Sequence, residues 1–276
     1  MCDEHTDTDN ARLSRRDFAL GASVASMAAL LPSPANAVPV TGRAVTITTP
    51  DGPAQAYYAA PRSGRHPAVL IWPDIMGLRP AFEGMASRLA ESGYAVLAVN
   101  QFHRTTRTPF TDLPDARGKA MEWRKTLTSA AIMRDATAFL RWLDQQPGVD
   151  ARRGIAVTGY CMGGPMTIQS AVAVPARVRA IASFHGAGLV TDAPDSPHRL
   201  VSKMRGRALI AIAQNDDARA PGDKDALRTA FATANVPAEI AVYPANHGWC
   251  PPDSPAYDKV QAERAWSRLL VLLKTV

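Results

Sequence analysis

The sequence is poor in cysteine, in charge and in long hydrophobic runs. Its 276 residues include only 3 cysteines, too few for the disulfide framework of a small secreted scaffold. No apolar run reaches the roughly 18 residues that a membrane-spanning helix needs. Hydrophobic residues make up 46% and charged residues 20% of the chain, which excludes intrinsic disorder over most of its length. The net charge is +6, but no basic helix or Arg-rich block organises it, so nucleic-acid binding is not expected.

The first 37 residues have the pattern of an export signal. Arg15 and Arg16 precede a mildly apolar stretch, 21–31, and Ala35-Asn36-Ala37 offers the small residues that a signal peptidase requires. These features resemble a twin-arginine signal; the alternative is an amphipathic helix that belongs to the domain. The resemblance implies that the precursor binds the twin-arginine export machinery. It also implies that residues 38–276 are the mature protein, periplasmic or secreted, without a membrane span.

Residues 38–276 alternate between strand and helix patterns. The β-rich segments 45–49 and 54–59 flank a Pro- and Gly-containing turn and predict an antiparallel hairpin. Farther along, continuous apolar runs predict buried strands, and helical periodicity predicts helices between them. Strands are expected at 68–72, 94–99, 154–158, 178–184, 208–213 and 238–243, and helices at 81–92, 116–146, 162–173, 222–234 and 256–274. This alternation predicts a single α/β domain, a mostly parallel sheet of about eight strands with helices on both faces.

One strand-to-helix junction has the pattern of a nucleophile elbow. In Gly159-Tyr160-Cys161-Met162-Gly163 a cysteine stands where α/β-hydrolases have a serine. The dipole of the following helix favours a thiolate there. In that fold the acid and then the histidine follow on later loops, each after a strand. Loop 214–221 carries Asp216 and Asp217, and loop 244–249 carries His247, so both positions are filled. Residue type alone does not decide between the two aspartates.

Together these motifs resemble the dienelactone hydrolase family, also called carboxymethylenebutenolidases. The resemblance implies the α/β-hydrolase fold and hydrolysis of a small ester or lactone, with no cofactor and no metal. The family has an acid four residues before a proline, which selects Asp217 rather than Asp216. The matching segments are Pro73-Asp74-Ile75-Met76-Gly77, Gly159 to Gly164, Ser183-Phe184-His185-Gly186, Asp217 with Pro221, and His247-Gly248-Trp249.

The resemblance implies a catalytic triad of Cys161, Asp217 and His247 that works through an acyl-thioester. In this fold the residue after the nucleophile and the loop after the third predicted strand supply the oxyanion hole. The backbone N–H groups concerned are those of Met162 and, by resemblance, Ile75.

Further residues are expected to contact the substrate. Asp74 stands where the family has an acid that pairs with the resting thiol, and Arg104 where it has an arginine that binds a substrate carboxylate. His185 and Trp249 are expected to line the pocket. The family's second carboxylate-binding arginine is replaced by Pro251, so another ester, a lactone or a thioester becomes a better candidate than dienelactone itself.

Two other function classes share these features. One is a thioesterase or peptidase-like hydrolase with the same triad. The other is a non-catalytic binding protein, because a fold does not determine a function. The complete set of cysteine, aspartate and histidine argues against the second class, since a protein released from catalysis does not need all three.

Overall fold

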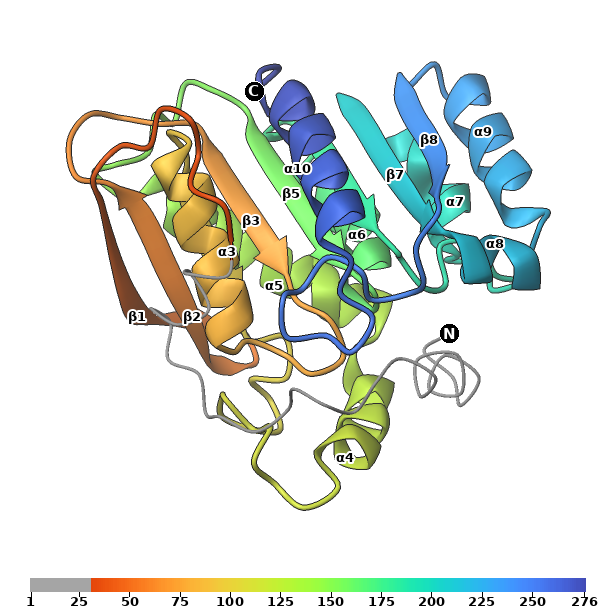
Figure 1. The fold of residues 1–276 in the computed structure, drawn as a ribbon, viewed down its shortest axis with the longest axis horizontal. Coiled ribbons are helices and arrows are strands. Elements are labelled where there is room, and N and C mark those ends of the chain that lie inside the picture. Colours follow the sequence, from red (N-terminus) through yellow and green to blue (C-terminus); the bar gives the residue numbers. More distant parts are fainter. Residues whose placement is uncertain (1–30) are drawn as a thin grey trace.

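An eight-stranded sheet runs through the centre of the molecule, in the order β1-β2-β4-β3-β5-β6-β7-β8 (Figure 1). The computed structural model describes residues 31–276, so the paired arginines of the predicted export signal lie outside the described residues. Strands β1 and β2 form the predicted hairpin, β2 is antiparallel to β4, and every other neighbouring pair is parallel. The strands are β1 (Val40–Thr49), β2 (Gly52–Pro61), β3 (Ala68–Trp72), β4 (Ala95–Val99), β5 (Ile155–Tyr160), β6 (Val178–Phe184), β7 (Arg207–Ala213) and β8 (Ala238–Tyr243).

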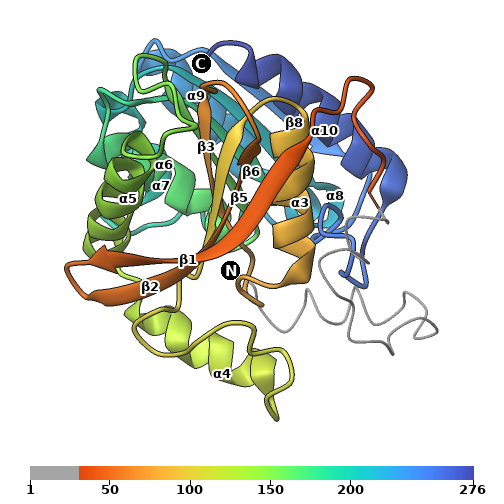
Figure 2. The ribbon, with the colours of Figure 1, turned by 90° about the vertical axis from the view of Figure 1, so that its left-hand side faces the viewer.

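Helices cover both faces of this sheet. Residues of α3 and α10 pack on one face, and residues of α5, α6 and α9 on the other (Figures 1 and 2). The predicted α/β-hydrolase fold is confirmed. The helices are α3 (Pro80–Glu91), α4 (Ala116–Trp123), α5 (Ser129–Asp144), α6 (Gly163–Ala173), α7 (Pro197–Leu200), α8 (Gln214–Arg219), α9 (Asp223–Thr233) and α10 (Lys259–Leu273), with short 3-10 turns at Arg124–Thr126 and Val201–Lys203.

Strand β3 shows why an unbroken apolar run forms a strand here. Successive side chains of a strand point to opposite faces. Leu70 and Trp72 therefore pack toward α5 and α6, whereas Val69 and Ile71 pack toward α3. All four are fully buried, and burying a side chain of this size stabilises the fold by roughly 1.5–3 kcal/mol. Both faces of the central strands are covered, so no polar alternation remains in the sequence.

The prediction of one continuous helix over 116–146 is wrong. The chain forms α4, a 3-10 turn and then α5, which begins at Ser129. The Oγ1 of Thr128 accepts a hydrogen bond from the Ala131 amide at 3.2 Å and so caps the N-terminus of α5. The apolar stripe continues across this break, which is why periodicity alone does not reveal it.

The parallel strands bring distant segments of sequence to one edge of the sheet. Because β3 to β8 run in the same direction, the loops that follow them emerge together at their carboxyl ends, where open α/β sheets bind ligands. The segments that directly follow these strands carry Ile75, Arg104, Cys161, His185, Asp216 and His247. No helix within residues 31–276 is long and apolar enough to cross a membrane.

Candidate active site

Cys161 lies on a sharp turn between β5 and α6. Its φ of 52° is in the left-handed region, which non-glycine residues rarely adopt. The turn leaves no space for a side chain two residues before or two residues after Cys161. A Cβ on Gly159 would lie 2.0 Å from the Gly163 carbonyl oxygen, and one on Gly163 would lie 2.3 Å from the Trp72 carbonyl oxygen. The two glycines therefore let α6 start directly against the end of β3, in the geometry of a nucleophile elbow.

The Ile75 amide, predicted to belong to an oxyanion hole, lies in a tight turn after β3. The Gly77 amide donates to the Asp74 carbonyl oxygen at 3.0 Å, which makes Ile75 the second residue of a β-turn. The Met76 amide donates to the Asp74 carboxylate at 2.9 Å. Within residues 31–276, neither the Ile75 amide nor the Met162 amide has a protein acceptor. Both N–H groups are thus available as donors at the sheet edge.

Asp216, and not Asp217, is the carboxylate that contacts His247. The Oδ2 of Asp216 lies 2.6 Å from the Nδ1 of His247, whereas Asp217 pairs with the Lys224 ammonium at 2.9 and 3.0 Å. The expectation that Asp217 is the partner is therefore wrong. Both aspartates lie on α8, where successive side chains point about 100° apart, so only one of them faces the histidine.

His247 is also held through its backbone. Its amide donates to the Oδ1 of Asn215 at 2.9 Å. The residue is 3% exposed, and Asn215 and Asp216 are neighbours on α8. One helical turn therefore anchors both the backbone and the imidazole of the histidine. The sequence did not indicate that Asn215 contacts His247, because this contact depends on helix α8, where a loop was predicted.

His185 and Trp249, predicted to line the pocket, lie beside the elbow and His247. The Cys161 amide donates to the Nδ1 of His185 at 3.1 Å, so His185 carries its proton on Nε2. Its ring lies 5.1 Å from the His247 ring and 5.0 Å from the Trp249 ring, between centroids. Both His185 and Trp249 are fully buried. Burial, and secondarily the nearby His247, lowers the pKa of His185 well below 6.5, so His185 is neutral and supports its neighbours.

Asp74, expected to pair with the resting thiol, is held by another group. Its two carboxylate oxygens accept hydrogen bonds from the Arg79 guanidinium at 2.7 and 2.9 Å. Arg79 also binds Asp253. Asp74 thus forms an ion pair with Arg79, and its expected pairing with the resting thiol stays a prediction. The ion pair between Arg79 and Asp253 was not predicted from the sequence. The one feature that could have pointed to Arg79 is its position directly before the proline that starts α3.

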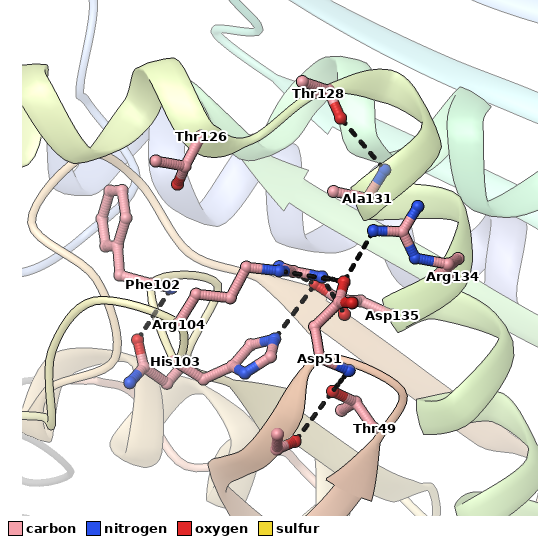
Figure 3. A network of polar contacts seen from close by, with 12 residues as sticks. Thr49, Asp51, Phe102, His103, Arg104, Thr126, Thr128, Ala131, Arg134 and Asp135 are labelled. Atoms are coloured by element: carbon pink, nitrogen blue, oxygen red, sulfur yellow. Dashed lines mark hydrogen bonds and ion pairs between the residues drawn. The ribbon is translucent and has the colours of Figure 1, made fainter.

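Arg104, expected to bind a substrate carboxylate, lies in a network of ion pairs between three segments (Figure 3). Its guanidinium binds both oxygens of Asp135 on α5, at 2.7 and 2.8 Å. It also binds Asp51 in the β1–β2 turn, which accepts from Arg134 as well. His103 completes the network at 3.2 Å from Asp135. Two protein carboxylates thus bind Arg104 in this structure, and its expected role as an anchor for a substrate carboxylate stays a prediction.

The fold and this loop arrangement define an α/β-hydrolase with a cysteine at the nucleophile elbow. The family model for the dienelactone hydrolase family matches residues 54–276. The chain belongs to this family, and it is a hydrolase of the ester and lactone class.

Relatives with curated names agree with this placement. A carboxymethylenebutenolidase of Pseudomonas sp. (strain P51) is 24% identical over 221 residues, covering 79% of this chain and 89% of that protein. A Bradyrhizobium sp. protein named a probable 2-oxo-3-(5-oxofuran-2-ylidene)propanoate lactonase is 27% identical over 234 residues, covering 79% and 88%. The crystal structure of a dienelactone hydrolase-like promiscuous phosphotriesterase from metagenomic libraries has the same fold, with a TM-score of 0.72 and 24% identity over 85% of this chain and 98% of that one.

Proposed function

We propose that this protein hydrolyses a small ester or lactone with Cys161 as nucleophile, His247 as base and Asp216 as the acid that orients the histidine. The observation that carries the proposal is the left-handed Cys161 at the elbow, with the 2.6 Å contact between His247 and Asp216 on neighbouring loops of the same sheet edge. A nucleophile, a base and a group that orients the base are the parts that covalent acyl transfer requires.

The hydrogen bond between Asp216 and His247 supports the proposed roles. Asp216 accepts the Nδ1–H of His247, so the Nε2 of His247 takes the proton of the Cys161 thiol. The thiolate adds to the substrate carbonyl carbon, and the carbonyl oxygen becomes an oxyanion that the Ile75 and Met162 amides stabilise. Collapse of this intermediate breaks the C–O bond, and the alkoxide oxygen takes the proton from His247. The alcohol leaves if the substrate is an ester and stays on the opened chain if it is a lactone, and an acyl-thioester remains on Cys161. His247 then removes a proton from water, which attacks the thioester to release the acid and restore the thiol.

The engaged arginines favour an uncharged substrate. Arg104 is bound by two carboxylates, as is Arg79, and position 251 is a proline. A substrate carboxylate would therefore have to displace an ion pair to reach either guanidinium. The relatives' names refer to lactones that carry a carboxylate group, a carboxymethylenebutenolide and a furanylidene propanoate. We infer that this chain takes a lactone or ester that lacks this carboxylate.

Activity of the full chain in reducing buffer tests the nucleophile. The Cys161→Ala variant should lose at least about 10³-fold in turnover of p-nitrophenyl acetate and of a neutral lactone, because removal of a nucleophile leaves only binding and oxyanion stabilisation. The matched control is Cys250→Ala, since Cys250 is buried and its burial raises the pKa of its thiol well above 9. Full activity of Cys161→Ala would overturn the proposal.

We further propose that residues 1–37 direct export through the twin-arginine machinery and that residues 38–276 act in the periplasm or outside the cell. The basis is the paired Arg15 and Arg16 followed by an apolar stretch and Ala35-Asn36-Ala37. Replacing both arginines with lysine should retain the protein in the cytoplasm in a fractionation experiment. Unchanged export of that variant would contradict the proposal.

A further inference from the structure

Arg79 joins two loops of the candidate active site. Its Nη1 and Nη2 bind the two oxygens of Asp74 at 2.7 and 2.9 Å, and its Nε and Nη2 bind the two oxygens of Asp253 at 2.6 and 2.9 Å. Its Nη1 also donates to the Gly77 carbonyl oxygen at 3.1 Å. An arginine has five N–H donors, and all five are used here.

The contacts make this arrangement rigid. Arg79 is 6% exposed, and its guanidinium carbon lies 5.0 Å from the centre of the Phe82 ring. Burial alone would lower the pKa of Arg79, but the charges and hydrogen bonds of Asp74 and Asp253 outweigh it and raise the pKa. The guanidinium is therefore permanently charged. Without it, two carboxylates from different loops would be left close together in a buried place, which is strongly unfavourable.

The two loops that Arg79 joins carry different parts of the proposed site. Asp74 and Gly77 are the first and last residues of the turn that presents the Ile75 amide, and Arg79 contacts both of them. Asp253 belongs to the segment between His247 and α10. His247 itself is anchored elsewhere, by Asn215 and Asp216. Loss of Arg79 should therefore disturb the oxyanion turn more than the pairing of the histidine with its acid.

We propose that Arg79 is a positioning residue that holds the Ile75 amide in place against the loop that follows His247. This inference rests on the proposed function, because it gives Ile75 a role in stabilising the oxyanion. Arg79 contacts neither the nucleophile nor the base in this structure, and it acts through the shape of the turn from Asp74 to Gly77.

Arg88 provides a matched control. It lies on α3, which Arg79 precedes directly. Arg88 is 7% exposed and binds one carboxylate, that of Glu263 on α10, through two hydrogen bonds of 2.7 and 2.6 Å. This pair joins two helices rather than two site loops. The variants Arg79→Gln and Arg88→Gln thus remove similar buried charges, and both should lower the melting temperature.

The experiment compares ester turnover with alkylation of Cys161 in the full chain under reducing conditions. Iodoacetamide reacts with a thiolate by direct displacement and forms no oxyanion, so its rate reports on Cys161 and His247 without the Ile75 amide. For Arg79→Gln we expect kcat for p-nitrophenyl acetate to fall about 10- to 100-fold, up to the loss seen when an oxyanion donor is removed. KM and the alkylation rate, followed on the Cys161 peptide by mass spectrometry, should stay within about twofold. Arg88→Gln should keep its kcat.

A milder variant covers the case in which Arg79→Gln does not fold. Asp253→Asn weakens one side of the bridge and retains the Arg79–Asp74 pair, so it should give a smaller fall in kcat with the same unchanged alkylation rate. An unchanged kcat in the folded Arg79 variant, or equal falls in kcat and alkylation, would overturn the inference. Failure of the proposed function is distinguished from this, because it would appear as activity in Cys161→Ala.

Discussion

Replacing Asp216 with asparagine should greatly impair the enzyme. The 2.6 Å contact with His247 is a hydrogen bond between a carboxylate and an imidazole, and in the proposed mechanism this imidazole becomes charged. Hydrogen bonds to charged groups contribute about 1.5–3 kcal/mol, or a factor of about 10 to 150 in rate at about 1.4 kcal/mol per tenfold. Asparagine can also donate to Nδ1, which would leave the proton on the wrong nitrogen. In the serine-protease triad the equivalent change costs about 10⁴, so we expect kcat/KM to fall by about 10² to 10⁴.

The neighbouring aspartate supplies the control. Asp217 pairs with Lys224 across side chains that are 20% and 26% exposed, and ion pairs of this kind contribute about 0–1 kcal/mol to stability. Asp217→Asn should therefore keep kcat/KM within about threefold. The assay is turnover of p-nitrophenyl acetate together with the pH dependence of Cys161 alkylation. We expect Asp216→Asn to shift that profile upward, because in the proposed mechanism a charged His247 stabilises the Cys161 thiolate and Asp216 stabilises that charge. A large loss in Asp217→Asn with a nearly normal Asp216→Asn would refute this reasoning.

Two further predictions concern a buried neutral histidine and the ion pairs of Arg104. Because burial lowers the pKa of His185 well below 6.5, the unfolded chain binds a proton there that the folded chain excludes. This residue should therefore reduce stability as the pH falls below about 6.5, by up to about 1.4 kcal/mol per pH unit. His185→Asn, which keeps an acceptor for the Cys161 amide, should flatten the decline between about pH 7 and 5 in urea titrations, and parallel profiles would contradict this. Arg104→Gln should lower stability. It should leave the ratio of kcat/KM for a carboxylate-bearing ester to kcat/KM for its neutral analogue unchanged within about twofold. A selective loss of activity on the charged ester would show that Arg104 anchors a substrate carboxylate.

The fold was predictable because its signals are local. Each buried strand is a short apolar run. Glycines are required at positions 159 and 163 because a Cβ there would lie 2.0 and 2.3 Å from backbone oxygens. The order of the motifs then placed Cys161 and His247 on loops at one sheet edge. The break between α4 and α5 was missed although Thr128 is a typical cap residue, because the apolar stripe crosses it.

The partners of the charged residues were not predictable in the same way. Arg79, which binds Asp74, also binds Asp253, and Arg104 binds Asp135; both of these aspartates are distant in sequence and are brought near by the fold. The choice between Asp216 and Asp217 depends on the rotation of a single helical turn. A spacing rule based on the following proline cannot capture that rotation.

The left-handed backbone at position 161 limits which nucleophiles evolution or design can install there. A φ of 52° is strongly unfavourable for side chains branched at Cβ. Serine has the same unbranched shape as cysteine and fits the turn, whereas threonine would strain it. The turn can therefore accommodate either cysteine or serine as the nucleophile. Threonine, whose secondary alcohol is a nucleophile in other hydrolases, would be strained at this position.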